Sequence, residues 1–190
     1  MRIPERFFEI IPNGRGESRV GGAMPAVLAS DAEFADGRYF FMTLSCTDFP
    51  VLGSRDVSIF LDETFAPFDE ETGYPEIRVY CARHLPSGPD PTGRGVMRDI
   101  RRGSLSLIER GDEPCFVKFG GQPMLLQVDD RYERPVKEAG YAFLFQVDES
   151  GFPDGFVEGD YPLGYGALYV YATFDAHGQV SEVVPGFSQF

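Results

Sequence analysis

Apolar and polar residues alternate along several short stretches of this chain, and this period of two is typical of β-strands with one buried face. The clearest stretch is residues 56–62, where Val57, Ile59 and Leu61 occupy every second position. Similar runs, bounded by clusters of Gly, Pro and Asp, recur along the sequence. The pattern predicts further strands over residues 39–46, 77–81, 124–128, 141–148 and 167–174.

Helix signals are fewer. We expect one short helix over residues 94–102, ended by Gly103, and helical turns within residues 29–35 and 129–139. The 22 glycines and 15 prolines among 190 residues suit a turn-rich β protein better than a helix bundle. The predicted fold class is therefore α+β, predominantly antiparallel β with few short helices, in a single domain over residues 1–190.

One short pattern occurs twice, about 100 residues apart. A basic residue, an apolar residue, Gly-Gly and then Pro occur within residues 19–25 and again within residues 118–123. Residues 37–50 then match residues 140–153 at a constant offset of 103. The pattern predicts an internal duplication of β units that share one core, with repeats over residues 18–62 and 117–175. The alternative is that a chain rich in Gly and Phe offers such matches by chance.

The charge is strongly negative and unevenly placed. The net charge is −13, and residues 138–190 contain eight acidic residues and no Lys or Arg. Such a chain repels phosphate backbones and anionic lipid, so we expect neither a nucleic-acid partner nor a membrane surface. Residues 150–166 combine acidic and aromatic side chains in a Gly- and Pro-rich loop. This composition indicates docking onto a protein partner with a basic face.

The candidate partner-binding residues are Asp154, Phe156, Glu158, Asp160, Tyr161 and Tyr165. The alternative is a solvated acidic loop whose aromatic rings fold back into the core. The oligomeric state is left open.

Catalytic and metal-binding patterns are weak. His84 follows Cys81 at the spacing of two zinc ligands, but a simpler interpretation is that Cys81 is a buried strand residue and that His84 begins a surface loop. His177 lies in a hairpin turn, and no nucleophile elbow or phosphate-binding loop occurs. The acidic pair Asp148-Glu149 is interpreted as a solvated turn. We therefore expect no cofactor and no metal, and an enzymatic activity is less favoured than binding.

The Gly-Gly elements predict tight turns that need positive φ. They also leave open an alternative function, in which a small ligand or substrate occupies a groove beside the second element. The residues of that groove would be Lys118, Gly120, Gly121, Gln122, Gln127, Gln146 and Asp148.

The cysteines and the N-terminus bear on the compartment. Three cysteines, an odd number, favour reduced thiols, and residues 1–6 contain no apolar segment of the kind a secretory signal needs. No run of about 18 apolar residues occurs, which argues against a membrane span. We expect a cytoplasmic protein.

Three motifs carry a resemblance to a known family. They are Phe119-Gly120-Gly121-Gln122-Pro123, then Phe143-Leu144-Phe145-Gln146-Val147-Asp148, and then Gly166-Ala167-Leu168-Tyr169-Val170-Tyr171. In this combination the chain is similar to the YwqG-like family of bacterial proteins, a domain family of unknown function. The resemblance is best over residues 115–175 and weaker over residues 18–62, where Thr43 stands in the position of Gln146.

The resemblance implies a mostly antiparallel β fold built by duplication, and no established activity. Some members look to be encoded near secreted bacterial toxins. The resemblance therefore suggests an immunity protein that occludes the active site of a cognate toxin.

Overall fold

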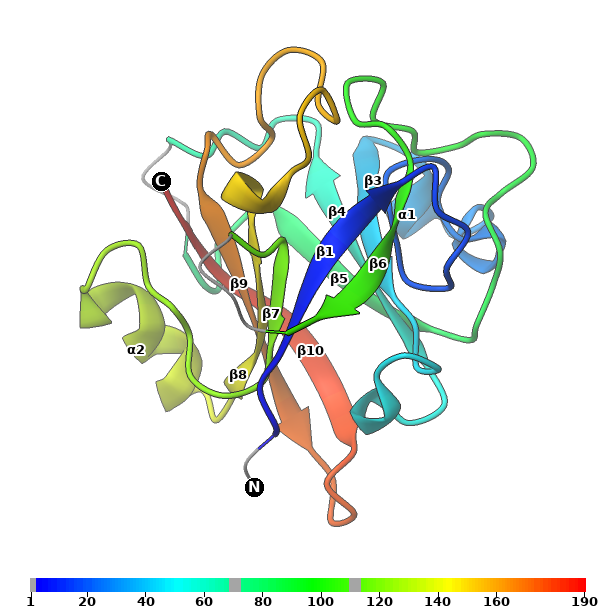
Figure 1. Ribbon diagram of the computed structural model, residues 1–190. Coiled ribbons are helices and arrows are strands. Elements are labelled where there is room, and N and C mark those ends of the chain that lie inside the picture. The colour runs from blue at the N-terminus through cyan, green and yellow to red at the C-terminus, as the bar shows by residue number, and fades with distance from the viewer. Residues whose placement is uncertain (1–2, 69–72, 110–113) are drawn as a thin grey trace.

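A single ten-stranded sheet forms the protein, as a computed structural model that describes residues 3–68, 73–109 and 114–190 shows (Figure 1). All ladders between its strands are antiparallel. The strands are β1 (Arg6–Pro12), β2 (Arg19–Val20), β3 (Arg38–Leu44), β4 (Asp56–Asp62), β5 (Val79–His84), β6 (Gly103–Ile108), β7 (Val117–Phe119), β8 (Ala142–Asp148), β9 (Ala167–Phe174) and β10 (Val180–Gln189). The expected β-rich class is thereby confirmed.

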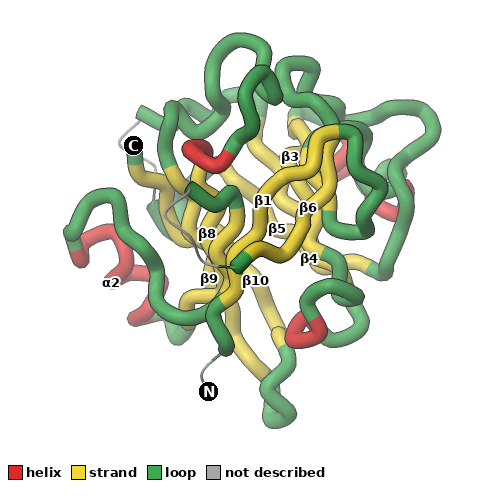
Figure 2. The backbone as a smooth tube through the Cα atoms, viewed as in Figure 1, coloured by secondary structure: helices red, strands yellow, loops and turns green. Residues whose placement is uncertain are grey.

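Helical structure is short and peripheral among the described residues (Figure 2). The two α-helices are α1 (Ala32–Ala35) and α2 (Asp130–Glu138), and three 3-10 turns are η1 (Ala26–Leu28), η2 (Pro50–Leu52) and η3 (Glu149–Gly151). In the described part of the chain, no helix has the length and apolar character needed to cross a membrane.

The order of strands in the sheet is β10-β9-β8-β7-β1-β6-β2-β3-β4-β5. Strands β1 to β5 correspond in this order to strands β6 to β10. When each strand is replaced by its counterpart, β1 by β6 and β2 by β7 and so on, the same order results, read from the other end. The central pair, β1 and β6, therefore joins two halves whose strands follow the same order, and each of these strands also pairs with the other half. The two end strands lie against each other, and Arg83 on β5 donates to the carbonyl of Ser181 on β10. The sheet nearly closes on itself.

The main core fills the inside of this curved sheet. On β4, Val57, Ile59 and Leu61 point inward to that core, while Phe60 belongs to a separate cluster on the outer face. Rings from both halves meet inside, as in the contact of Phe41 with Phe116 at 6.2 Å between centroids. Burying these apolar side chains from both halves in one space is the main favourable contribution to folding.

In each half, a segment outside the strands also packs over part of the outer face of the sheet. In the first half, the segment around η1 and α1 packs Met24, Leu28 and Phe34 against Phe60. In the second half, the segment that ends in α2 packs Val136 against a cluster that includes Tyr169 and Tyr171. The sheet is therefore buried on both faces over much of its area, and this is why its strands contain few exposed side chains.

Most of the expected strands are present. The predictions over residues 39–46, 56–62, 141–148 and 167–174 correspond to β3, β4, β8 and β9, and the prediction at 77–81 is displaced toward β5. The helical turns expected within residues 29–35 and 129–139 are confirmed by α1 and α2. The hairpin turn at His177 is also confirmed, and Asp175 accepts the His177 amide at 2.8 Å.

Two elements were predicted wrongly. Residues 124–128 are not a strand but an irregular segment with bends at Leu126 and Gln127 that crosses the outer face, because side chains of the sheet take up its backbone groups. The helix expected over residues 94–102 is a loop. Gly103 begins β6 instead of ending a helix, because it pairs with Pro12 of β1. The site requires a glycine, since a Cβ there would lie 2.6 Å from Ile10 Cγ2. The spacing of apolar residues over 94–102 reflects contacts with the rest of the fold rather than one face of a helix.

The two Gly-Gly turns are built alike. All four glycines have positive φ, at 65° and 79° for Gly21 and Gly22 and 72° and 70° for Gly120 and Gly121, as the sequence predicted. The Gly21 amide donates to Phe41 O at 2.9 Å, and the Gly120 amide donates to Leu144 O at 2.8 Å. Each turn follows β2 or β7 and lies close to the backbone just before β6 or β1, at Arg101 and Pro4.

We expect Gly120→Ala to destabilise the fold strongly. The new Cβ would lie 2.5 Å from the carbonyl oxygen of Pro4, and φ is +72°. A loss of about 2–4 kcal/mol in the free energy of unfolding should result, measured by urea denaturation. The matched control is Gly155→Ala, where φ is +67° but no atom lies within 4 Å, and about 1 kcal/mol is expected. Equal losses in the two variants would contradict the steric explanation.

Candidate protein-binding surface

The acidic loop, residues 150–166, begins within η3 and leads to β9, and it is drawn in yellow and orange at the top of Figure 1. Its inner side belongs to the core. Phe156 is 1 % exposed and stacks on Phe152 at 5.6 Å between centroids, and Leu163 is fully buried. Phe156 therefore fixes the loop to the sheet and is not on the surface where a partner would meet it.

The other predicted contact residues lie on the outer side of the loop. Asp154, Glu158 and Asp160 are exposed, and Tyr161 is half-buried. Tyr165 is 74 % exposed and stacks on Tyr161 at 4.2 Å between centroids. The sequence alternative of a loop that folds into the core thus describes Phe156, while the acidic residues and Tyr165 face solvent.

Glu149 fixes the position of the acidic loop through hydrogen bonds to its backbone. Its side chain is 1 % exposed, and its carboxylate accepts the backbone amides of Leu163 at 2.7 Å, Tyr165 at 2.9 Å and Gly166 at 3.3 Å. These bonds maintain Tyr165 at a φ of 63°, which is unusual for a residue with a side chain. The interpretation of Asp148-Glu149 as a solvated turn was therefore wrong for Glu149. The pair of acids by itself carries no signal that one of them is buried.

Burial and hydrogen bonding act in opposite directions on the pKa of Glu149. Desolvation raises the pKa of its carboxyl to about 7, against the three amide donors that favour the charged form. Glu158, by contrast, forms an exposed ion pair with Arg101 at 2.7 Å, which contributes little to stability.

The proposed groove beside the second Gly-Gly element is largely occupied by the protein itself. Lys118 is 1 % exposed, donates to Gly120 O at 2.9 Å and to Gln122 O at 2.5 Å, and pairs with Glu5 at 2.8 Å. Asp148 accepts the Ser150 amide at 2.9 Å. A depression of about 450 Å³ does lie beside Gly121 and Gln122, but the ammonium of Lys118 is engaged within the fold.

Side chains of the sheet, Gln146 among them, hold the segment 124–128, which we call the strap. The Gln146 side chain bonds both the amide and the carbonyl of Met124, at 2.7 and 3.3 Å. Tyr169 accepts the Leu126 amide at 3.0 Å, and Gln189 accepts the Gln127 amide at 3.1 Å. Gln146 is buried and bonds the strap, whereas Gln127 is exposed and belongs to the strap rather than to a strand.

A chain of polar side chains is buried in the first half. His84 is 3 % exposed, not the surface residue expected, and its Nε2 lies 2.8 Å from Ser58 Oγ, which lies 2.6 Å from Thr43 Oγ1. Burial lowers the pKa of His84 and raises the pKa of the Cys81 thiol. A neutral imidazole and a protonated thiol suit a structural role. Over the described ranges, no group of His, Cys, Asp or Glu residues is arranged to hold a metal ion.

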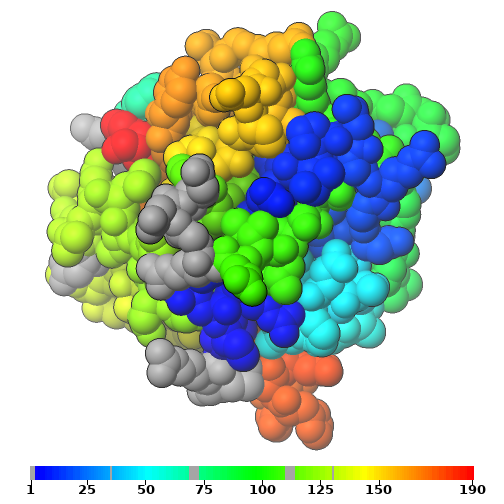
Figure 3. Space-filling view, viewed as in Figure 1, coloured from blue at the N-terminus to red at the C-terminus, as the bar shows by residue number. Residues whose placement is uncertain are grey.

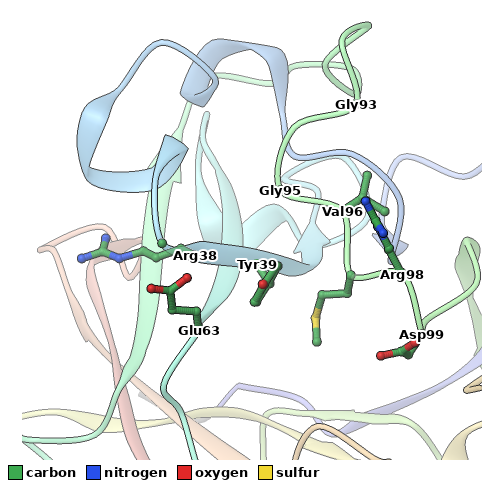
Figure 4. A pocket seen from close by; sticks show the side chains of 10 residues that line it. Arg38, Tyr39, Glu63, Gly93, Gly95, Val96, Arg98 and Asp99 are labelled. Atoms are coloured by element: carbon green, nitrogen blue, oxygen red, sulfur yellow. The ribbon is translucent and has the colours of Figure 1, made fainter. Parts of the chain in front are cut away.

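An open depression of about 660 Å³ lies between the start of β3 and the loop at residues 93–99 (Figure 4). Arg38 and Glu63 lie at one end of it, and Arg98 and Asp99 at the other. Arg38 is already engaged, because it stacks over the Tyr80 ring at 3.3 Å and pairs with Glu33 at 3.4 Å. Charges of both signs at an open surface do not select one class of ligand.

Comparison with known proteins identifies no relative: no family model, no curated protein and no solved structure matches this chain. The functional argument therefore depends on the chain's own residues.

The buried carboxyl of Glu149 predicts a specific pH dependence. Because its pKa is about 7 in the folded chain and 4.5 ordinarily, the stability that its neutral form contributes is complete below pH 4.5 and is lost as the pH rises through 7. Relative to Glu149→Gln, which is neutral throughout, the wild-type free energy of unfolding should fall by about 3 kcal/mol over this range. Urea denaturation at several pH values measures the difference, and a constant difference would contradict the assignment.

Proposed function

We propose that this chain is a non-enzymatic binding module that docks onto a protein with a basic face. The observation that carries the proposal is Tyr165, an aromatic side chain that is 74 % exposed although a buried carboxylate holds its backbone in place. Exposed aromatic rings on a pre-ordered backbone are typical anchors of protein interfaces, because little conformational entropy is lost when they bind.

Charge supports the choice of partner. Asp154 and Asp160 are exposed on the same loop as Tyr165, and residues 138–190 contain no Lys or Arg. A field of one sign steers a partner of the opposite sign and raises the association rate. The same field opposes binding to nucleic acid or to anionic membranes.

The more specific proposal is an immunity protein that neutralises a bacterial toxin by covering its active site. It draws on the similarity to the YwqG-like family, some members of which look to be encoded near toxins. Occlusion requires a stable acidic surface and no cofactor. The three cysteines are free thiols, which supports a reducing, cytoplasmic location.

We also propose that the chain arose by internal duplication. The palindromic strand order supports this, and so do the two Gly-Gly turns. Arg19 donates to Ala23 O at 2.7 Å, much as Lys118 donates to Gln122 O at 2.5 Å. The β-bulges also correspond, between Phe40 and Met42 in one half and between Phe143 and Phe145 in the other. These pairs keep the offset of 103 seen in the sequence.

A tagged pull-down from the native host, washed at rising salt, tests the binding function. We expect a stoichiometric basic protein that resists moderate salt. The variant Asp154→Lys/Asp160→Lys should fold normally and lose at least tenfold in affinity, since it reverses two exposed charges on the loop that carries Tyr165.

The control variant is Glu138→Lys/Asp36→Lys, which makes the same charge change at exposed positions away from the loop. Equal losses in both variants would indicate an effect of net charge alone. Retention of a small molecule with no protein partner would contradict the proposal and favour the alternative, ligand binding near the Gly-Gly elements.

A further inference from the structure

Several large apolar side chains are exposed on segments that contact one another next to the acidic loop. They are exposed by between 47 and 96 % and come from four separate segments of the chain. The set, which we call the apolar platform, is Phe68, Leu126, Val128, Tyr165 and Phe190.

Contacts between these segments hold the platform together. The rings of Phe68 and Phe190 meet edge to face, with centroids 4.7 Å apart. Phe68 also packs on Gly164, where an added Cβ would lie 2.8 Å from its Cζ, so it adjoins the residue before Tyr165. In Figure 3 the red atoms of the C-terminal end lie between the orange atoms of the acidic loop and the yellow-green atoms near α2.

The strap forms the other side of the apolar platform. The Gln127 side chain donates to Phe190 O at 2.8 Å, and Gln189 bonds both the amide and the carbonyl of Gln127, at 3.1 and 2.9 Å. Leu126 and Val128, on either side of Gln127, are left 47 % and 96 % exposed. An exposed apolar group of this kind, fixed by hydrogen bonds beneath it, is a feature of interaction sites.

We propose that the apolar platform is the centre of the docking surface and that it receives apolar side chains of a partner segment rich in Lys and Arg. This inference rests on the proposed function and names the contact surface for it. Phe156, which the sequence suggested as an anchor, is buried; Phe68, Phe190 and the strap take that role.

The charges around the platform favour a basic partner over a second copy of this chain. In sequence, Asp129 and Asp130 follow Val128, and Asp160 lies in the acidic loop beside Tyr161. Arg131, three residues after Val128, pairs with Asp129 at 2.6 Å. Two copies that each carry a net charge of −13 would repel one another, whereas a basic segment would be attracted.

Site-specific photo-crosslinking in the native host tests the platform directly. Benzoylphenylalanine placed at Val128 should crosslink one heterologous protein, at a segment in which an apolar residue is flanked by Lys or Arg. The same probe at Val27 or Leu85, which are 45 % and 57 % exposed on the other half, should give no such product. A crosslink to a second copy, no crosslink, or an equal yield from Val27 would overturn the inference.

The second test of the platform measures the affinity for the partner captured in the pull-down. We expect Leu126→Ser/Val128→Ser to weaken binding at least tenfold, and the matched variant Val27→Ser/Leu85→Ser to leave it unchanged. Thermal unfolding confirms that both fold. If a basic partner binds but only the control pair weakens it, or neither does, the platform is wrong while the binding function stands. If no protein partner is captured, the binding function itself fails.

Discussion

The antiparallel pairing of β1 with β6 is the constraint on which the rest of the molecule depends. Six residue pairs join these strands, from Phe7 opposite Ile108 to Pro12 opposite Gly103. Each strand also pairs with the opposite half, β1 with β7 and β6 with β2. Neither half can therefore complete its sheet alone, and both contribute side chains to one core. We expect the chain to unfold as one cooperative unit for this reason.

The near-closure of the sheet determines where irregular segments can lie. The inside is filled by apolar side chains, so connections must pass over the outer faces or the ends. The strap and α2 cover the outer face of β8, β9 and β10, and the segment around α1 covers that of β3, β4 and β5. The acidic loop spans one end. Its hydrophobic anchors Phe152 and Phe156 enter the core and its charged residues remain outside, so a single loop combines a stabilising side and a binding side.

Buried polar groups give the binding side its shape. Glu149, Gln146 and Gln189 each satisfy backbone groups of a segment that has no strand partner. A buried carboxylate or amide without such partners would be costly, so these bonds specify one position for the loop and one for the strap. The exposed rings of Tyr165 and Phe190 are in this way presented from fixed backbone positions. That order connects the packing of the fold to the proposed docking function.

Local sequence patterns were enough to predict β3, β4, β8 and β9 from alternation and the Gly-Gly turns from their need for positive φ, because both depend on near neighbours in sequence. The acidic charge follows from composition alone. The helix expected over residues 94–102, the strand expected over 124–128 and the surface position of Phe156 and His84 were wrong, because their outcome depends on partners far away in sequence. The Glu149 carboxyl illustrates this. Nothing in Asp148-Glu149 distinguishes the two acids, and only the return of the chain at residues 163–166 brings three amides to one of them. The apolar platform likewise exists only in the folded chain, since Phe68, the strap and Phe190 are brought together by the closure of the sheet.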